Sequence, residues 1–576
     1  MARLDRLEPP TRDLLQFASV IGLRFAFDIL LGAYPYPMTD TEMRERLNHL
    51  VHADLARLEH PDPDLVYLFK HALTYEVAYN CLPFARRREL HARVGDFLEQ
   101  VFRDHLDEIA GVLAGHFAEG QRWGKALYAA LVAGTRAQEL YARQEALSYY
   151  RLAEEYLRHL QLDAVWLQAL RLYLNRGRLS HLMGQYASAE SDLQFALDIA
   201  RAHDDTRAQA EAYNILAESY WWQSRNDDML DAARKAYEIA REGGHTAEMA
   251  ASTRMMGVTY QTLGKPDRAK RYLDEAHRLA VDLDDEPLRA TVLNELGINR
   301  VAAGELDEAL DLFQRCLEIR QQIGLKDKIA SALVNIAQVH QRLGDVSQSL
   351  ATFQQAIALA REVASGALPY SLLSQVEAEA YAGHYDAALQ LAEEAREIFA
   401  ARHDATGLAW VKLRLGFDVY LDQGRDDLAR PALEEALAAL RASASYEEIV
   451  QALVGLGVSA LRAGDTATAR AHLDEAHELC GAHSLNWPLA QVLVCQGRVA
   501  LAEERTDEAE SLARAALDAI EHHSCADCRG PAFELLAQAA ARRGDRSAAQ
   551  QLRAQAVESS QKRCRYVERM AILRNA

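Results

Sequence analysis

The pattern of small, apolar and polar residues in this chain returns about every forty residues. Units with a turn residue followed by an amphipathic stretch begin at positions 184, 224, 264, 304, 344, 383, 424, 464, 504 and 544. In most units a small residue follows five positions after the start, another follows twelve positions after it, and a third lies seven positions before it. Repeats of this length are typical of a solenoid, in which each unit buries its apolar face against its neighbours.

The small residues predict that each unit is a hairpin of two helices. Two packed helices approach within about 8–10 Å where the side chains at their crossing are small. The glycine that starts most units can adopt the left-handed backbone conformation that ends the first helix. We call the helix before this turn helix A and the helix after it helix B.

A few units depart from the pattern. Ser224 and Glu504 replace the turn glycine, and Met229 replaces the first small residue. The unit that starts at Gly424 follows its predecessor by 41 residues, so it contains an extra residue and its helix register is open. We expect these units to be wider or shifted.

The repeat resembles the tetratricopeptide repeat (TPR). The resemblance rests on the small residue before the turn, on the tyrosines at Tyr220, Tyr260 and Tyr420, on the turn glycine and on the two later alanines. It covers ten units over residues 163–576, and degenerate opening repeats precede them at 105–162. It implies a mainly α fold, a right-handed TPR superhelix. The minimal repeat has 34 residues, so each unit carries about six more, which we place in helix B and the following loop. Such long repeats resemble those of large bacterial signalling ATPases and kinesin light chains.

Residues 1–104 show no forty-residue repeat and form a separate predicted domain. Their pattern predicts helices at 9–22 and 38–55, a hairpin at 56–70, and helices at 71–82 and 84–102. A Thr or Asp residue is the expected N-cap of the helix at 38–55. This order is that of a winged-helix domain. The segment YLFKHALTYEVAYNCLPFARRRELHARVGDFLE resembles the junction between the ATPase core and the TPR array in bacterial STAND-type regulators. The resemblance implies that the winged helix is a regulatory joint and the array a sensor.

Composition limits the partner and the compartment. The 576 residues carry a net charge of −20, and residues 1–100 hold 12 Lys and Arg against 15 Asp and Glu, which disfavours nucleic acid or an anionic membrane. The sequence has no run of eighteen apolar residues and no secretory signal at its start. Seven cysteines in a long chain are not a disulfide framework, so we expect a cytoplasmic protein.

Signatures of catalysis are absent from the sequence. EGQRWGKALY and LGKPDRA lack the glycine spacing and the Ser or Thr of a P-loop. No nucleophile elbow, paired-carboxylate signature or H-E-x-x-H motif occurs. We therefore expect no enzyme and no nucleotide cofactor in this chain, with an ATPase domain supplied in cis or in trans.

Helix A positions that line the concave face of a TPR array are the candidate binding residues. They combine asparagine, glutamine and arginine, whose several donors suit peptide backbone or carboxylate, although any solenoid also needs a polar inner face. Adjacent tryptophans point about 100° apart on a helix, so both can hardly be core. One is either an aromatic anchor for a ligand or packs against the displaced repeat at Ser224. The candidates are Arg171, Arg178, Asn214, Glu218, Trp221, Trp222, Arg254, Gln261, Asn294, Gln338, Gln341, Arg342, Arg414 and Arg498.

The loop EHHSCADCRG is a weaker candidate for zinc. His522, His523, Cys525 and Cys528 offer imidazole and thiolate ligands. The second C-x-x-C pair that makes a zinc assignment specific is missing, so reduced cysteines are the alternative.

Two functions follow from the sequence. The first is a non-catalytic sensor and scaffold of a bacterial signal-transduction ATPase, which binds a protein, a peptide or a small inducer on the TPR surface and relays it through the winged helix. The alternative is a transcription regulator that contacts DNA through the winged helix and uses the repeats as its ligand domain.

Overall fold

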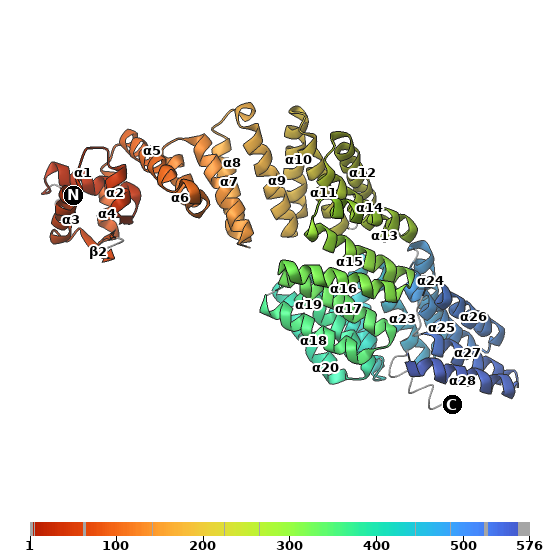
Figure 1. Ribbon diagram of the computed structural model, residues 1–576. Helices are drawn as coiled ribbons and strands as arrows, with labels where there is room; N and C mark the ends of the chain where they lie inside the picture. Colours follow the sequence, from red (N-terminus) through yellow and green to blue (C-terminus); the bar gives the residue numbers. More distant parts are fainter. Residues whose placement is uncertain are drawn as a thin grey trace. The chain divides into compact units, whose positions relative to one another are not determined.

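The computed structural model describes Leu4 and residues 6–60, 65–140, 142–223, 225–263, 265–363, 365–443, 445–483, 485–523 and 528–562. The chain is mainly helical and divides into two compact units, Met1–Ser219 and Tyr220–Ala576 (Figure 1). The division falls within one helix of the array. The domain limits at 104/105 and 162/163 stay predictions.

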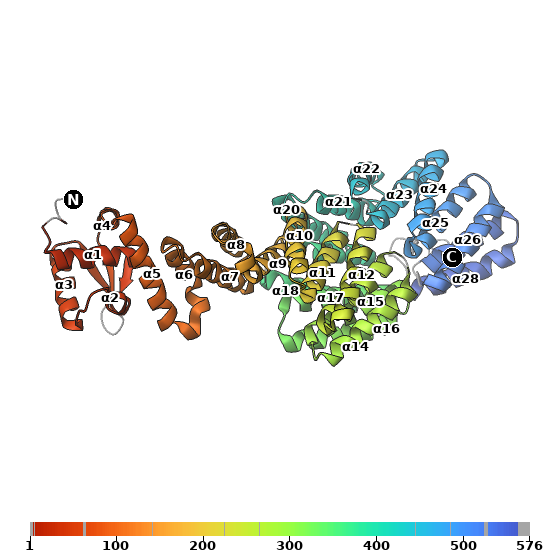
Figure 2. The same cartoon turned by 90° about the horizontal axis from the view of Figure 1, so that it is seen from above.

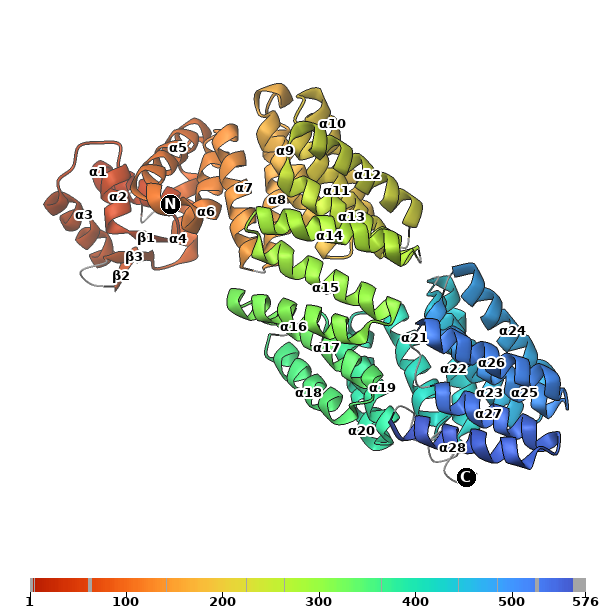
Figure 3. The same cartoon turned by 45° about the vertical axis from the view of Figure 1, so that its right-hand side comes forward.

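The first unit begins with a small mixed fold. Its elements are α1 (Pro9–Ile21), β1 (Arg24–Ala26), α2 (Phe27–Ala33), α3 (Asp40–His52), β2 (Ala56–His60) and β3 (Val66–Phe69). The strands form an antiparallel sheet in the order β1-β3-β2, as Figure 3 shows. The predicted helices and hairpin are present, but the sequence did not predict β1 or the range of α2.

Local chemistry sets α3, and aromatic packing holds the sheet. Thr39 caps α3 in a capping box with Glu42, which confirms the predicted cap. Phe25 on β1 is buried and packs edge-on against Phe69 on β3, with ring centroids 5.6 Å apart.

Helical hairpins begin directly after the sheet. The next elements are α4 (Ala72–Asn80), α5 (Phe84–Val101), η1 (Arg103–His105), α6 (Leu106–Glu119), α7 (Trp123–Glu139), α8 (Arg143–Leu157) and η2 (Leu162–Ala164). The predicted helices at 71–82 and 84–102 are therefore confirmed as α4 and α5. Helix α5 packs against α1, α2 and α6, so it joins the small fold to the first hairpin.

From α9 onward, helices A carry odd numbers and helices B even ones (Figure 2). The first hairpins are α9 (Trp166–Leu182), α10 (Tyr186–Ala202), α11 (Thr206–Trp222), α12 (Asn226–Gly243), α13 (Thr246–Thr262), α14 (Pro266–Asp282), α15 (Glu286–Ala303), α16 (Leu306–Ile323), α17 (Lys326–Leu343) and α18 (Val346–Glu362). The later ones are α19 (Leu368–Ala382), α20 (Tyr385–Ala401), α21 (Ala405–Arg414), η3 (Leu415–Tyr420), α22 (Asp426–Ala442), α23 (Tyr446–Arg462), α24 (Thr466–His483), α25 (Asn486–Ala502), α26 (Thr506–His523), α27 (Arg529–Arg542) and α28 (Arg546–Lys562).

The turn glycines adopt the predicted left-handed conformation. Their φ angles lie between 70° and 87° at Gly184, Gly304, Gly344, Gly383, Gly424, Gly464 and Gly544. Glu504, which replaces glycine, takes the same conformation with φ 62°. Ser224 and Gly264 lie outside the described residues.

The extra length of each unit was assigned to the wrong place. Half a period after the turn glycines, a second left-handed residue ends helix B, at Asp204, Gly244, Asp284, Gly324 and His403. Helix A and helix B are both 17 or 18 residues long in most hairpins. The turn after helix A and the turn after helix B are equally short, so the added residues extend both helices and not the loop.

The small residues of helix A permit the close approach that the sequence predicts. A Cβ atom added at Gly257 or Gly457 would lie 2.7 or 2.8 Å from the side chain of Leu273 or Leu473 on helix B. Gly416 approaches Leu433 in the same way, at 2.8 Å, although it lies one residue farther from its turn. The π-helix η3 holds the extra residue of this unit, so the register of the packing is restored.

Candidate functional site

The helices A form the inner face of the array. In the first compact unit, helix α7 contacts α9. In the second compact unit, α13 contacts α15, and each helix A from α17 to α25 contacts the following helix A. Contacts of similar extent between successive helices B are absent from the described part of the chain. Since the helices A lie closer together than the helices B, each stack curves with the helices A on its inner side.

Arg171 lines a pocket on the inner face of the first of the two compact units. The pocket has a volume of about 360 Å³, and α7 and α9 supply most of its lining, including Tyr128, Arg136, Gln168 and Asn175. The guanidinium group of Arg171 makes no hydrogen bond or ion pair with any described residue. Arg136 lies 3.5 Å from Asp107, so its charge is partly compensated.

Other candidates of the first unit are already engaged with their neighbours. Arg178 forms an ion pair with Glu211 on the next helix A. Asn214 is buried, and the carboxylate of Glu218 lies 3.9 Å from Nε2 of His181. Burial lowers the pKa of His181, and the Glu218 charge opposes this effect. Arg178 and Glu218 therefore connect α9 to α11.

The two tryptophans at the end of α11 both reach solvent. Trp221 is 39% exposed and Trp222 is 61% exposed, and their rings meet edge-on with centroids 4.8 Å apart. Neither side chain is core, and their binding role stays a prediction.

In the second unit the amide candidates join successive helices A. Asn335 donates to Asn294 at 2.8 Å, Gln338 donates to Ser374 at 3.2 Å, and Gln341 donates to Glu377 at 3.4 Å. These hydrogen bonds join α15 to α17 and α17 to α19.

Arg414 is the charged centre of this inner face. Its guanidinium lies 3.0 Å from Glu377 on α19 and 3.2 Å from Asp418 one turn later. Burial alone lowers the pKa of Arg414, but the carboxylates of Glu377 and Asp418 outweigh burial and raise it. Glu448 on α23 faces the same cation, and burial raises the pKa of its carboxyl.

The remaining inner-face candidates are half-buried on their helices A: Arg254, Gln261, Arg342 and Arg498. Arg498 also lines a small pocket of about 160 Å³ with Gly457, Leu461 and Cys495.

The zinc candidates fall mostly outside what the structure describes. Cys525 and the side chains of His522 and His523 lie outside the described residues. Cys528 is buried in an apolar cluster with Leu493 and Val494. The described residues contain no group of three or more His, Cys, Asp or Glu side chains that could hold a metal ion.

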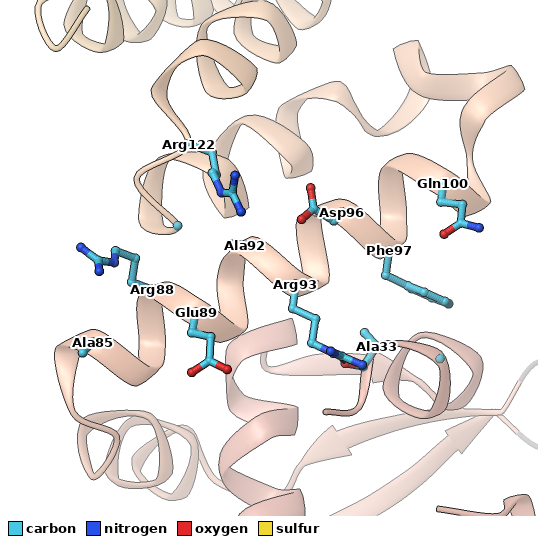
Figure 4. A pocket seen from close by; sticks show the side chains of 12 residues that line it. Ala33, Ala85, Arg88, Glu89, Ala92, Arg93, Asp96, Phe97, Gln100 and Arg122 are labelled. Atoms are coloured by element: carbon cyan, nitrogen blue, oxygen red, sulfur yellow. Dashed lines mark hydrogen bonds between the residues drawn. The ribbon is translucent and has the colours of Figure 1, made fainter. Parts of the chain in front are cut away.

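A second pocket, beside α5, was missed in the sequence. It has a volume of about 830 Å³ and lies between α5, the end of α2 and the turn from α6 to α7 (Figure 4). Its side chains on α5 recur at three- and four-residue intervals: Ala85, Arg88, Glu89, Ala92, Arg93, Asp96, Phe97 and Gln100. That helical spacing was visible in the sequence, but the opposite walls come from segments distant along the chain.

None of the described helices has the length and apolar character needed to cross a membrane.

Comparisons with known proteins identify the repeats. The family model "Tetratricopeptide repeat" matches residues 208–281, 248–322, 288–362 and 328–401. The model "Anaphase-promoting complex subunit 5" matches residues 168–218. No curated protein sequence matched the chain.

Solved structures resemble the chain at low identity. A Rap protein complexed with competence and sporulation factor is 15% identical, with 62% of this chain and 98% of that chain covered and a TM-score of 0.49. The heterotetramer Cut9-Hcn1 of APC/C is 14% identical, with 85% and 93% covered and a TM-score of 0.46. A STAND protein with a TPR sensor from Pyrococcus horikoshii is 15% identical, with 82% and 63% covered and a TM-score of 0.36.

The forty-residue period, the left-handed turns and the family match together identify the repeats as tetratricopeptide repeats. The chain is a helical solenoid that contains tetratricopeptide repeats, a fold that serves as a scaffold for protein interactions.

Proposed function

We propose that this chain is the non-catalytic sensor part of a bacterial signal-transduction ATPase. In this proposal the inner face of the helices A binds a protein, a peptide or a small inducer. Residues 1–104 act as a winged-helix joint that relays binding to an ATPase domain, supplied in cis or in trans. The proposed compartment is the cytoplasm.

The observation that carries the binding role is the pocket around Arg171. The guanidinium group of Arg171, which has no ion pair with any described residue, lines this pocket together with the amides of Gln168 and Asn175, the phenol ring of Tyr128 and the carboxylates of Asp107 and Glu139, which pair with Arg136. Guanidinium and amide groups bind carboxylates and peptide backbone through several fixed hydrogen bonds, and an exposed tyrosine adds apolar contact area. The pocket therefore suits a peptide segment.

The relay follows from how α5 is packed. The element order of residues 9–69 supports a winged-helix fold, and α5 contacts both that fold and α6. A ligand acts through this joint if it binds one arrangement of the first hairpins better than another. Hydrogen exchange of α5 with and without bound ligand measures the coupling.

A peptide display library tests the binding role. The full chain is panned with random twelve-residue peptides, and the enriched peptides are measured by fluorescence anisotropy. We expect Arg171→Glu to weaken binding at least about tenfold, since a charge-assisted contact contributes about 1.5–3 kcal/mol. Arg151→Glu, on the exposed surface of α8, makes the same charge change outside the pocket and should bind normally. Equal binding by both variants, or no enriched peptide, would contradict the proposal.

The alternative, a DNA-contacting regulator, has weaker support. Helix α3, the DNA-reading candidate in a winged helix, carries Asp40, Glu42 and Glu45 against two arginines. Arg44 is paired with Asp40 at 2.6 Å. Phosphate binding needs a net basic surface, so salt-sensitive DNA binding by the full chain would be required to revive this alternative.

A further inference from the structure

The pocket beside α5 contains three arginines whose charges no carboxylate of the described residues neutralises. Arg88 donates to the amide oxygen of Gln121 at 2.9 Å. Arg93 donates to the backbone carbonyls of Ala33 and Tyr34 at 2.7 and 3.0 Å. The side chain of Arg122, at the start of α7, has no partner among the described residues.

The two carboxylates of the pocket are paired with cations outside it. Glu89 accepts from Arg86 at 2.8 Å, and Asp96 accepts from Lys125 at 2.6 Å. Lys125 also pairs with Glu99 at 2.6 Å, so this cation serves two carboxylates, and the groups in and around the pocket retain a net charge of about two positive units. The whole chain, in contrast, has a net charge of −20. An excess of positive charge on an acidic protein favours an anionic partner.

Close backbone packing fixes the walls of the pocket. A Cβ atom added at Gly32 would lie 2.1 Å from the ring of Phe97, and one added at Gly120 would lie 2.9 Å from the backbone of Ala92. Helices α2 and α6 are therefore pressed against α5 on both sides. The arginines are held on rigid elements, which reduces the ordering cost of binding.

The length of the pocket favours a protein segment over a small anion. The lining on α5 runs from Ala85 to Gln100, about 22 Å at 1.5 Å per residue. That length accommodates about six or seven residues of extended peptide.

We propose that the pocket beside α5 binds an extended acidic segment of a partner protein, with carboxylates paired to Arg88, Arg93 and Arg122. Figure 4 shows Arg88 and Arg93 on α5 and Arg122 at the α6–α7 turn, with the Arg93 side chain directed toward Ala33. Arg88 and Arg93 are about 7.5 Å apart along the helix axis. Carboxylates two residues apart in an extended peptide match this spacing. The site is independent of the Arg171 pocket.

The test uses two fluorescein-labelled heptapeptides and the full chain. One peptide alternates Glu and Ser between terminal Leu residues, and the other replaces each Glu by Gln. We expect the Glu peptide to bind at least about tenfold more tightly, and Arg88→Glu/Arg122→Glu to remove this preference. Arg151→Glu/Arg158→Glu on and after α8 is the matched control and should retain it.

Equal binding of the two peptides, or a preference that the pocket variant retains, would overturn the proposal. Tighter binding of duplex DNA or tripolyphosphate to the same arginines would also overturn it, in favour of a phosphate ligand. Arg122→Gln is the safeguard against misfolding, because the Arg122 side chain makes no hydrogen bond or ion pair with any described residue. It should weaken binding of the Glu peptide alone.

Discussion

Acidification should destabilise the joint between the N-terminal fold and the first hairpins, through a buried pair of histidines. Nδ1 of His91 on α5 lies 3.0 Å from Nδ1 of His116 on α6, and the hydroxyl of Tyr79 lies 2.9 Å from Nε2 of His91. Both imidazoles are 7% exposed. Burial lowers the pKa of each to about 4, and His116 and the Arg87 cation add to this effect at His91.

The magnitude follows from these pKa values. In the unfolded chain histidine titrates near 6.5, so the unfolded state binds more protons than the folded state between pH 6.5 and pH 4. The stabilisation is therefore complete above pH 6.5 and is lost as the pH falls toward 4. Between pH 7 and pH 5, each imidazole lowers the free energy of unfolding by about 2 kcal/mol, and the two together lower it by about 2–4 kcal/mol.

Hydrogen exchange followed by mass spectrometry measures this loss locally. Protection of α5 and α6 amides, corrected for intrinsic exchange rates, should fall by about 30-fold or more from pH 7 to pH 5, which corresponds to the lower figure. His91→Gln/His116→Gln keeps polar side chains without titration and should flatten this dependence. An unchanged protection factor in the wild type, or the same fall in the double variant, would refute the assignment to these histidines.

Three further predictions concern the array and its cysteines. Arg414→Met should lower the free energy of unfolding by about 2–3 kcal/mol, because it leaves the buried carboxylate of Asp418 without its cation; adding Asp418→Leu should recover part of the loss in urea unfolding. Gly464→Ala should destabilise by about 1 kcal/mol, because φ is 82° there, whereas Gly115→Ala, inside α6 with open space around it, should stabilise by about 0.5–1 kcal/mol; equal thermal shifts would contradict this contrast. Iodoacetamide at pH 8 should label exposed Cys81 and spare Cys480, whose thiol pKa is raised to about 11 by burial, as peptide mapping would show; comparable labelling of both would count against the packing.

The sequence alone determined the features that depend on neighbouring residues. Turn glycines such as Gly304 and Gly344, the helices around them and the small residues at Gly257 and Gly457 follow from steric rules that act within one hairpin. The Thr39 cap was visible for the same reason. The length of helix A was misjudged because the turn after helix B could not be located from the sequence. Its left-handed residue is Asp204, Asp284 or His403 in some repeats and glycine in others.

Only the tertiary structure decided how the polar residues of the inner face are used. Asn294 meets Asn335 and Glu377 meets Arg414 across about one repeat, so these contacts depend on the rotation between successive hairpins. The sequence pattern that selected the inner-face candidates therefore included residues that form ion pairs, such as Arg414, and one that forms none with any described residue, Arg171. The pocket beside α5 escaped prediction because Arg88 and Arg122 are joined by packing between helices, and hydrophobic periodicity carries no information about which helices meet.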